Sequence, residues 1–265
     1  MQCTDQLGRH IVLHTFPPRR IVSVVPSQTE LLADLGLEEE VVGITKFCVH
    51  PQHWYRSKTR VGGTKKLHLD RIDELQPDLI LANKEENERT QIEALAARYP
   101  VWVSDIVQLE DALDMICRVG ALVGHTQMAI QMAHRIREGF ARLRQQAMSH
   151  YPIRVAYFIW RQPWMVVGND TFIHSVLQAA GLVNVFADRS RYPEVQLEEV
   201  EEAAPDVLLL SSEPFPFGQR HVRELATYLP HIPAVLVDGQ MCSWYGSRLL
   251  YTTDYLAQFV AKLQD

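Results

Sequence analysis

Residues 69–81 have the sequence LDRIDELQPDLIL, and residues 197–209 have the sequence LEEVEEAAPDVLL. In both, a leucine, an acid, a β-branched residue, an acid pair and Pro-Asp recur in the same register before an apolar run. This order predicts a short helix, a break at Pro-Asp and then a buried strand. The chain therefore contains an internal duplication.

The segments around the two copies repeat as well. Ile21–Val25 and Val155–Ile159 are β-branched runs that suit buried strands. A helix is expected after each run, and Gly36 and Gly181 are the expected stops. The first helix is expected to open with a capping box, Ser27–Glu30, and the second to cover Phe172–Ala180. Further helices are expected at Gln91–Arg98 and Val222–Tyr228, followed by strands at Val101–Val103 and Ala234–Val237.

One uninterrupted helical pattern, about Thr126–Ser149, separates the two halves, with apolar residues at spacings of three and four. Strand–helix alternation on both sides predicts parallel sheets covered by helices. We therefore expect an α/β fold with two lobes, their mainly parallel sheets flanked by helices, joined by one long backbone helix. The expected boundaries are 1–124 for the N-terminal lobe, 125–150 for the helix and 151–265 for the C-terminal lobe.

The amino-acid composition argues against some classes of function. The 265 residues are 47% apolar and 22% charged and carry a net charge of −6, which is typical of a globular protein and disfavours nucleic acid as a partner. No apolar run approaches the roughly 20 residues that span a bilayer, so a membrane-embedded protein is not expected. The four cysteines show no clustered spacing, so free thiols are favoured over disulfides. Cys117 is expected in the core.

The N-terminal residues 1–14 are polar and lack the apolar segment of a signal peptide. If Met1 is the native start, the expected compartment is the cytoplasm. If an export signal was removed, it is the periplasm or the cell surface.

Ligands of open parallel sheets bind at the carboxyl ends of the strands, so the loops after the strands are the candidate site. These loops are rich in large aromatic residues, which predicts a flat, stacking pocket, or else rings that pack the interface between the lobes. Cationic side chains in the same loops could hold carboxylates or phosphates of a ligand, or lie solvated at the surface. The candidate ligand-binding residues are Phe47, His50, Lys65, Lys66, Lys84, Trp160, Arg161, Trp164, Phe215, Trp244, Tyr245 and Arg248, and Trp54 lies in the same loops.

Cys48 and His50 suggest a metal site, although a structural zinc site needs four ligands and no partner pair is visible. His50 precedes Pro51 and is equally compatible with an extended loop residue. A metal-dependent enzyme that uses Cys48, His50 and a carboxylate such as Glu85 is an alternative, but no complete catalytic motif is present.

Asp70 and Glu198 occupy matching positions in the duplicated segment. An acid in the first turn of a helix is favoured by the helix dipole, which explains the pair without any function. The alternative is a matched pair of docking residues, one on each lobe, that engages two basic sites on a partner.

The chain resembles a family of periplasmic binding proteins whose lobes are joined by a helical backbone, the class III type. The resemblance rests on Arg20–Glu30 with Leu35-Gly36 and Val42–Ile44, on Val61–Thr64 with Leu69–Ile72 and Pro77–Ile80, and on Val167–Ile173 with Gly181–Phe186. It runs from Arg20 to the C-terminus and is nearest the vitamin B12-binding branch. The family's members capture ferric siderophores, haem or cobalamin for ABC importers, and acids at the positions of Asp70 and Glu198 dock onto permease arginines.

The resemblance implies a non-catalytic solute-binding protein that holds one metal chelate, such as cobalamin, a ferric siderophore or haem, in an aromatic cleft between the lobes. The chelate is cargo, and no covalent cofactor is implied. Alternatives are a cytoplasmic carrier or sensor of the same ligand class, and the metal-dependent enzyme.

Overall fold

A computed structural model describes residues 1–149 and 151–264; residues 150 and 265, where two of the expected lobe boundaries fall, lie outside that part of the chain. The chain forms two compact units. Unit 1 contains residues 1–106, 110–135 and 245–248, and unit 2 contains residues 107–109, 136–244 and the segment from Leu249 onward. The long helix α6 (Thr126–Ala147) therefore contributes its first part to unit 1 and its second part to unit 2.

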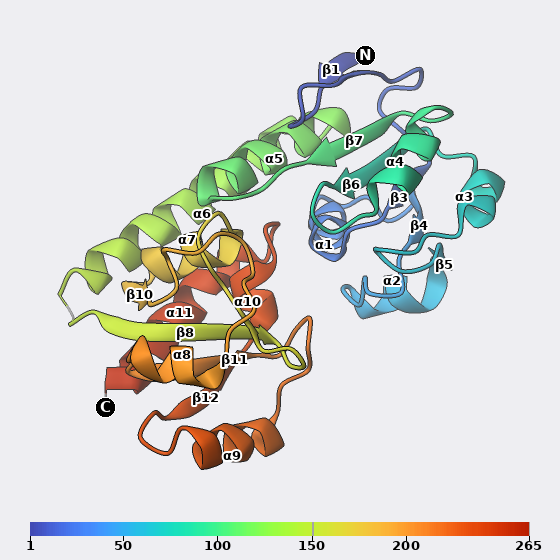
Figure 1. The fold of residues 1–265 in the computed structure, drawn as a ribbon. Coiled ribbons are helices and arrows are strands. Elements are labelled where there is room, and N and C mark those ends of the chain that lie inside the picture. Colours follow the sequence, from blue (N-terminus) through green and yellow to red (C-terminus); the bar gives the residue numbers. More distant parts are fainter. Residues whose placement is uncertain (150, 265) are drawn as a thin grey trace. The chain divides into compact units, whose positions relative to one another are not determined.

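Unit 1 is built on a parallel five-stranded sheet with the order β5-β4-β3-β6-β7 (Figure 1). Its central strands are apolar and buried, as expected for a sheet that is covered on both faces. The strands are β3 (Ile21–Ser23), β4 (Val41–Ile44), β5 (Thr59–Arg60), β6 (Leu79–Asn83) and β7 (Val101–Ser104). The helices are α1 (Pro26–Asp34), α2 (Gln52–Ser57), α3 (Leu69–Leu75), α4 (Arg89–Ala96) and α5 (Leu109–Leu122).

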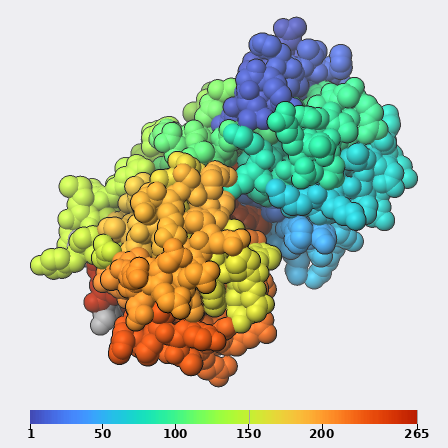
Figure 2. All heavy atoms as spheres, viewed as in Figure 1, coloured from blue at the N-terminus to red at the C-terminus, as the bar shows by residue number. Residues whose placement is uncertain are grey.

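A hairpin of β1 (Gln2–Thr4) and β2 (His10–Val12) lies beside the edge strand β7. Gln6 donates its backbone N–H to the Val103 carbonyl, and Arg118 of α5 donates to the Thr4 carbonyl. Figure 2 shows these first residues, in dark blue, against the green surface of the β7 and α5 region. The segment thus occupies hydrogen-bonding groups that an edge strand would otherwise leave open.

Unit 2 repeats the arrangement with a sheet of order β10-β8-β11-β12, all parallel, to which β9 adds as an antiparallel strand on β8. Val200 of α8 and Leu225 of α9 share one buried cluster with Ala156, Phe158 and Leu208, so both helices cover the same face of the sheet. The strands are β8 (Ile153–Trp160), β9 (Met165–Val166), β10 (Leu182–Asn184), β11 (Val207–Ser211) and β12 (Ala234–Val237). The helices are α7 (Phe172–Ala179), α8 (Leu197–Glu202), α9 (Gln219–Tyr228), α10 (Gly239–Ser243) and α11 (Leu249–Gln264).

The duplicated segments form the same structure in both units. α3 leads into β6 and α8 leads into β11, and each of these strands pairs with the first strand of its sheet. Asp78 accepts the backbone N–H groups of Arg19 and Arg20, and Asp206 accepts that of Arg154. The Pro-Asp aspartate thus ties the end of the helix to the start of the first strand in each half. The α/β fold with parallel, helix-flanked sheets is as the sequence predicts.

Two local predictions were wrong. Helix α1 begins at Pro26 with Val25 as its N-cap, so Ser27 lies inside the first turn and forms no capping box. Proline is favoured at the first helical position because its fixed φ suits the helix and its missing N–H has no partner there. Cys117 is half-buried, because it lies at the margin of the apolar face of α5 and outside the core. All four cysteines are free thiols. Among the described residues, no helix combines the length and hydropathy that crossing a bilayer requires.

Candidate functional site

The carboxyl edge of the unit 1 sheet carries a polar cluster that includes a segment from the far end of the chain. Arg248 forms a two-point ion pair with Glu30 of α1, with Nε–Oε2 at 2.9 Å and an Nη2–Oε1 distance of 2.5 Å. The two side chains are only 11% and 15% exposed. Burial raises the pKa of Glu30. The positive charge of Arg248 and the neighbouring His50 lower it in part, but the effect of burial is larger. This ion pair fixes the segment of residues 245–248 on α1.

Tyr245 provides a second anchor in the same segment. Its hydroxyl donates to Glu86 Oε1 in the loop after β6, and its ring is buried. Burial and the carboxylates of Glu86 and Glu85 raise its pKa well above the ordinary value, so the phenol stays protonated. Gly246 approaches the Ser27 carbonyl so closely that a Cβ there would lie 2.5 Å from the oxygen. Tyr245 and Arg248 are therefore held by unit 1 itself.

The loop after β6 is shaped by two buried asparagines. Asn83 Oδ1 accepts the backbone N–H groups of Glu85 and Glu86, and Asn87 Oδ1 accepts the N–H of Asn83. Asn87 also donates to the carbonyls of Val24 and Thr64, which joins three of the carboxyl-edge loops. These bonds hold Glu85 and Glu86 half-exposed at the edge of the sheet.

Phe47 is the large aromatic side chain that unit 1 presents at this edge, and half of its surface is exposed (50%). Its ring and the side chain of Lys46 pack on Gly63, where a Cβ would lie 3.2 Å from the ring and 3.3 Å from Lys46 Cε. The ammonium group of Lys46 lies 5.0 Å from the ring centroid, within cation–π range. An aromatic surface with a cation beside it is thus present in unit 1.

The predicted lysines differ in their partners. Lys84 pairs with Asp105 at 2.7 Å, and Lys65 Nζ donates to the Glu85 carbonyl oxygen at 2.6 Å. Lys65 and Lys66 lie in a tight turn closed by reciprocal backbone bonds between Gly63 and Lys66. Both are exposed.

Cys48 is fully buried and contacts the hydroxyls of Thr29 and Thr45, each at 3.1 Å. Burial raises the pKa of its thiol to about 11, so the thiolate that binds metals is disfavoured. Within residues 1–149 and 151–264, no group of three or more His, Cys, Asp or Glu side chains could hold a metal ion. The geometry therefore gives the proposed Cys48–His50 metal site no support.

Unit 2 carries an aromatic cluster at the carboxyl edge of β8 and β11. Trp160 meets Phe215 edge-to-face at 5.7 Å, Phe215 lies 4.7 Å from Phe217, and Phe217 stacks on Trp164 at 6.3 Å. Trp160 is 40% exposed, whereas Trp164 and Phe215 are half-buried. The structure thus brings together Trp160, Trp164 and Phe215, which are predicted to bind the ligand, with Phe217, another aromatic residue of the same loops.

Arg161 lies over the Trp164 ring at 5.5 Å and forms an ion pair with Glu224, whose oxygens lie 2.9 and 3.1 Å from Nε. Trp244 is buried, and its Nε1 donates to Glu213 at 2.8 Å. Trp54, which the sequence predicts in a loop, lies in helix α2, where it is fully buried with its Nε1 bonded to Glu38. Trp54 and Trp244 therefore pack inside their units, and the indole N–H of each finds an acceptor within its own unit.

Asp70 and Glu198 lie where the duplication predicts. Each is exposed in the first turn of its helix, Asp70 in α3 and Glu198 in α8. The matched pair therefore stands in equivalent positions of the two units.

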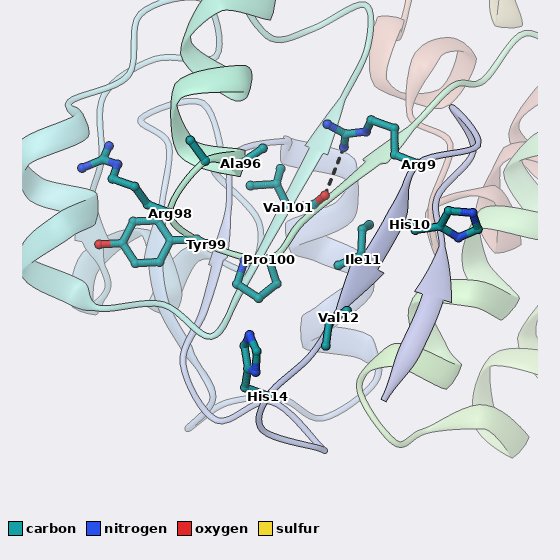
Figure 3. Close-up of a pocket in the computed structure, with 11 residues that line it drawn as sticks. Arg9, His10, Ile11, Val12, His14, Ala96, Arg98, Tyr99, Pro100 and Val101 are labelled. Atoms are coloured by element: carbon teal, nitrogen blue, oxygen red, sulfur yellow. Dashed lines mark hydrogen bonds between the residues drawn. The ribbon is translucent and has the colours of Figure 1, made fainter.

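A surface pocket of about 420 Å³ lies at the start of β7, away from the carboxyl edge of the unit 1 sheet (Figure 3). Its walls include Val12 and His14 from the N-terminal segment and Pro100 before β7. Arg9 at its rim donates to the Val101 carbonyl and pairs with Asp5, so its charge is already compensated. The predicted ligand-binding residues do not line this pocket.

Sequence reasoning missed several residues that hold the site. Asn83 and Asn87 fix the acidic loop, Glu30 and Glu86 anchor the 245–248 segment, and Glu213 anchors Trp244. Asparagine at the end of a buried strand, as Asn83 is in β6, is the one signal that the sequence offers for such a loop. Glu30, Glu86 and Glu213 lie far in sequence from the side chains that they anchor, so local patterns do not reveal these contacts.

Comparison with known proteins agrees with this architecture. A model of the periplasmic binding protein family matches residues 21–234. The vitamin B12-binding protein of Yersinia pestis (strain Pestoides F) is 26% identical over 261 residues, covering 96% of this chain and 91% of that protein. The vitamin B12-binding protein of Vibrio cholerae serotype O1 is 27% identical over 198 residues, 74% of this chain and 71% of that protein.

Solved structures show the same fold. The periplasmic vitamin B12-binding protein of Vibrio cholerae superposes with a TM-score of 0.80 at 22% identity, over 95% of this chain and 100% of that one. The periplasmic haem-binding protein BhuT, in complex with two haems, superposes with a TM-score of 0.81 at 22% identity, over 93% and 99%. Because the family model spans most of the sequence and both units carry the duplicated α/β topology, this chain belongs to the periplasmic binding protein family.

Proposed function

We propose that this chain is a solute-binding protein that captures one metal chelate of the corrinoid, haem or ferric-siderophore type and delivers it to an ABC importer. The observation that carries the proposal is the pair of aromatic surfaces at the carboxyl edges, Phe47 in unit 1 and the Trp160–Phe215 cluster in unit 2. Aromatic rings exposed at a strand's carboxyl end are suited to stack on a flat ligand. The ligands named for the relatives are of this kind.

The chelate is bound as cargo, and the protein acts as a binding protein without catalysis. The buried Cys48 thiol, with its pKa of about 11, is unsuited to a nucleophile or metal ligand, which weakens the enzyme alternative.

The first experiment titrates the reduced protein with cyanocobalamin, haem and a ferric siderophore, following tryptophan fluorescence and the visible spectrum of the chelate. Saturable quenching at micromolar or tighter affinity by one of them supports the proposal. Trp160→Ala is expected to weaken that binding about tenfold, because a stacking surface is lost. No saturable binding of any chelate would refute the proposed function.

Tyr151→Ala is the matched control. Tyr151 precedes β8 and is 93% exposed, whereas Trp160 ends the same strand at its carboxyl edge. An equal loss of affinity in both variants would show that the aromatic cluster is not the binding surface.

We further propose that Asp70 and Glu198 dock the loaded protein on the importer, since they are exposed and equivalent in the two units. The double charge reversal Asp70→Lys/Glu198→Lys should abolish stimulated uptake in importer-containing vesicles while chelate affinity stays unchanged. Glu74→Lys/Glu202→Lys, which reverses exposed acids on the same two helices, serves as the control. Unchanged stimulated uptake in the docking variant would refute docking through Asp70 and Glu198. Absence of stimulated uptake with the unaltered protein would favour a carrier or sensor that works without a permease.

A further inference from the structure

Three lysines, Lys46, Lys65 and Lys66, lie in neighbouring loops at the carboxyl edge of unit 1. Lys46 lies beside Phe47, and Lys65 and Lys66 lie in the turn that Gly63 closes. Both Phe47 and Lys46 pack on Gly63, so the aromatic ring and the turn form one surface, here called the Phe47 platform (Lys46, Phe47, Gly63, Lys65 and Lys66). Within residues 1–149 and 151–264, none of these three ammonium groups forms an ion pair.

Other cations at the carboxyl edges are compensated. Arg248 pairs with Glu30, Arg161 with Glu224 and Lys84 with Asp105. Among the described residues, Lys65 Nζ has its polar contact with the neutral Glu85 backbone carbonyl, which leaves the charge of the ammonium group in place. The platform thus carries three ammonium groups beside the acidic loop of Glu85 and Glu86, on a chain whose net charge is −6.

The turn that contains Lys65 and Lys66 is also fixed by side-chain hydrogen bonds from Asn87 and Gln91. Asn87 Nδ2 donates to the Thr64 carbonyl, and Gln91 donates to the Lys65 carbonyl and accepts the Leu67 N–H. Like charges held near one another on a braced turn raise the local potential and favour an anion. The exposed ring beside them favours a flat, apolar body.

We propose that the solute bound by this protein carries an anionic group, a carboxylate or a phosphate, that pairs with Lys46 and Lys66 while its flat body stacks on Phe47. This inference rests on the proposed function and adds the charge class of the ligand. Haem supplies such a group through its propionates, and cobalamin supplies one through its phosphodiester. Uncharged or cationic ferric siderophores lack one.

The test compares matched chelates. Haem is set against its dimethyl ester and cyanocobalamin against dicyanocobinamide, which lacks the phosphate together with the rest of the nucleotide, with ferrichrome as an uncharged siderophore. We expect one acidic chelate to bind at least about tenfold more tightly than its neutral partner, and its affinity to fall with rising salt. The member that binds distinguishes a carboxylate from a phosphate.

The variant Lys46→Gln/Lys66→Gln should weaken the acidic chelate about three- to tenfold and flatten its salt dependence, while the neutral partner is unaffected. Lys262→Gln, an exposed lysine near the end of α11, should change neither. Lys46→Arg/Lys66→Arg should keep the affinity, because the charge is retained.

Equal affinity for the acidic and neutral members of a pair, or preferred binding of ferrichrome, would overturn the inference and leave the proposed function standing. Binding of none of these chelates would refute the proposed function itself. The two failures are therefore distinguishable.

Discussion

At the scale of the residue, burial assigns roles that residue type leaves open. Cys48 and Arg248 are both plausible ligand contacts by chemistry, yet the first is fully buried between two threonine hydroxyls and the second is largely buried against Glu30. A buried thiol remains protonated, and a buried guanidinium needs its carboxylate. Both side chains therefore stabilise unit 1, whereas exposed Phe47 is open to a partner.

Cys48 should resist alkylation in the native protein. Its pKa rises from 9.0 to about 11, so at pH 9 it remains largely a thiol in the folded chain and is about half ionised when unfolded. Iodoacetamide at pH 9 should modify half-buried Cys3 and Cys117 first, as read by peptide mass spectrometry. Comparable labelling of Cys48 within the same time would contradict its burial.

The raised pKa of Cys48 also sets the direction in which folding stability changes with pH. The unfolded chain loses the Cys48 proton near pH 9, and the folded chain holds it to about pH 11. Stability contributed by the protonated thiol is therefore complete below pH 9 and is lost as pH rises towards 11. Cys48→Ala should remove part of the decline in unfolding free energy between pH 9 and 11, measured by urea denaturation.

Arg248→Ala should destabilise the protein by about 3 kcal/mol, because removing one partner of a largely buried ion pair leaves Glu30 uncompensated. Urea denaturation measures the change. Arg89→Ala, which breaks the exposed pair with Glu93 on α4, should leave the midpoint unchanged. Similar midpoints for the two variants would show that the buried pair is not a structural anchor.

At the scale of the element, the Pro-Asp break explains why the two halves share a topology. Gln76 and Ala204, each just before its proline, adopt positive φ values of 44° and 45°, which end the helices α3 and α8. The aspartates that follow then accept backbone N–H groups at the start of β3 and β8. One local motif thus connects a helix end to the neighbouring strand in both units.

Asp78→Ala and Asp206→Ala should therefore destabilise the protein to a similar degree, about 1–2 kcal/mol each, through lost hydrogen bonds to backbone donors. Asparagine at either position retains an accepting oxygen and should recover most of the loss. Unfolding free energies from urea titration provide the comparison. A large effect at one site and none at the other would contradict the equivalence of the two motifs.

At the scale of the whole molecule, unit 1 is discontinuous in sequence. Residues 245–248 belong to it although Trp244 and Leu249 belong to unit 2. Tyr245 and Arg248 satisfy Glu86 and Glu30, which the first 135 residues alone would leave without these partners. Uncompensated buried polar groups are costly, so unit 1 depends on the C-terminal half of the chain.

A fragment of residues 1–135 is expected to unfold at a lower urea concentration than unit 1 does within the full chain, or to lack a cooperative transition. Circular dichroism measured along a urea titration follows the unfolding of the fragment and of the full chain. Glu30→Leu/Glu86→Leu in the fragment removes the two carboxylates and should recover part of the stability. A wild-type fragment with the midpoint of the full chain would show that the 245–248 segment is dispensable.

The duplication, the strand–helix alternation and the long helix could all be derived from the sequence, because each depends on local periodicity and turn residues that the chain carries in order. The matched positions of Asp70 and Glu198 follow from the same register. The capping box at Ser27–Glu30 failed for a local reason, since Pro26 competes for the helix start.

The partners of the charged and aromatic side chains were decided by the tertiary structure alone. Trp160 and Trp244 look alike in sequence, yet one ends exposed and the other is buried on Glu213. Arg248 and Lys66 look like similar cations, yet only Arg248 meets a carboxylate, 218 positions away in the chain. Burial and charge pairing depend on which distant segments share a surface, and periodicity records only which face of an element is apolar.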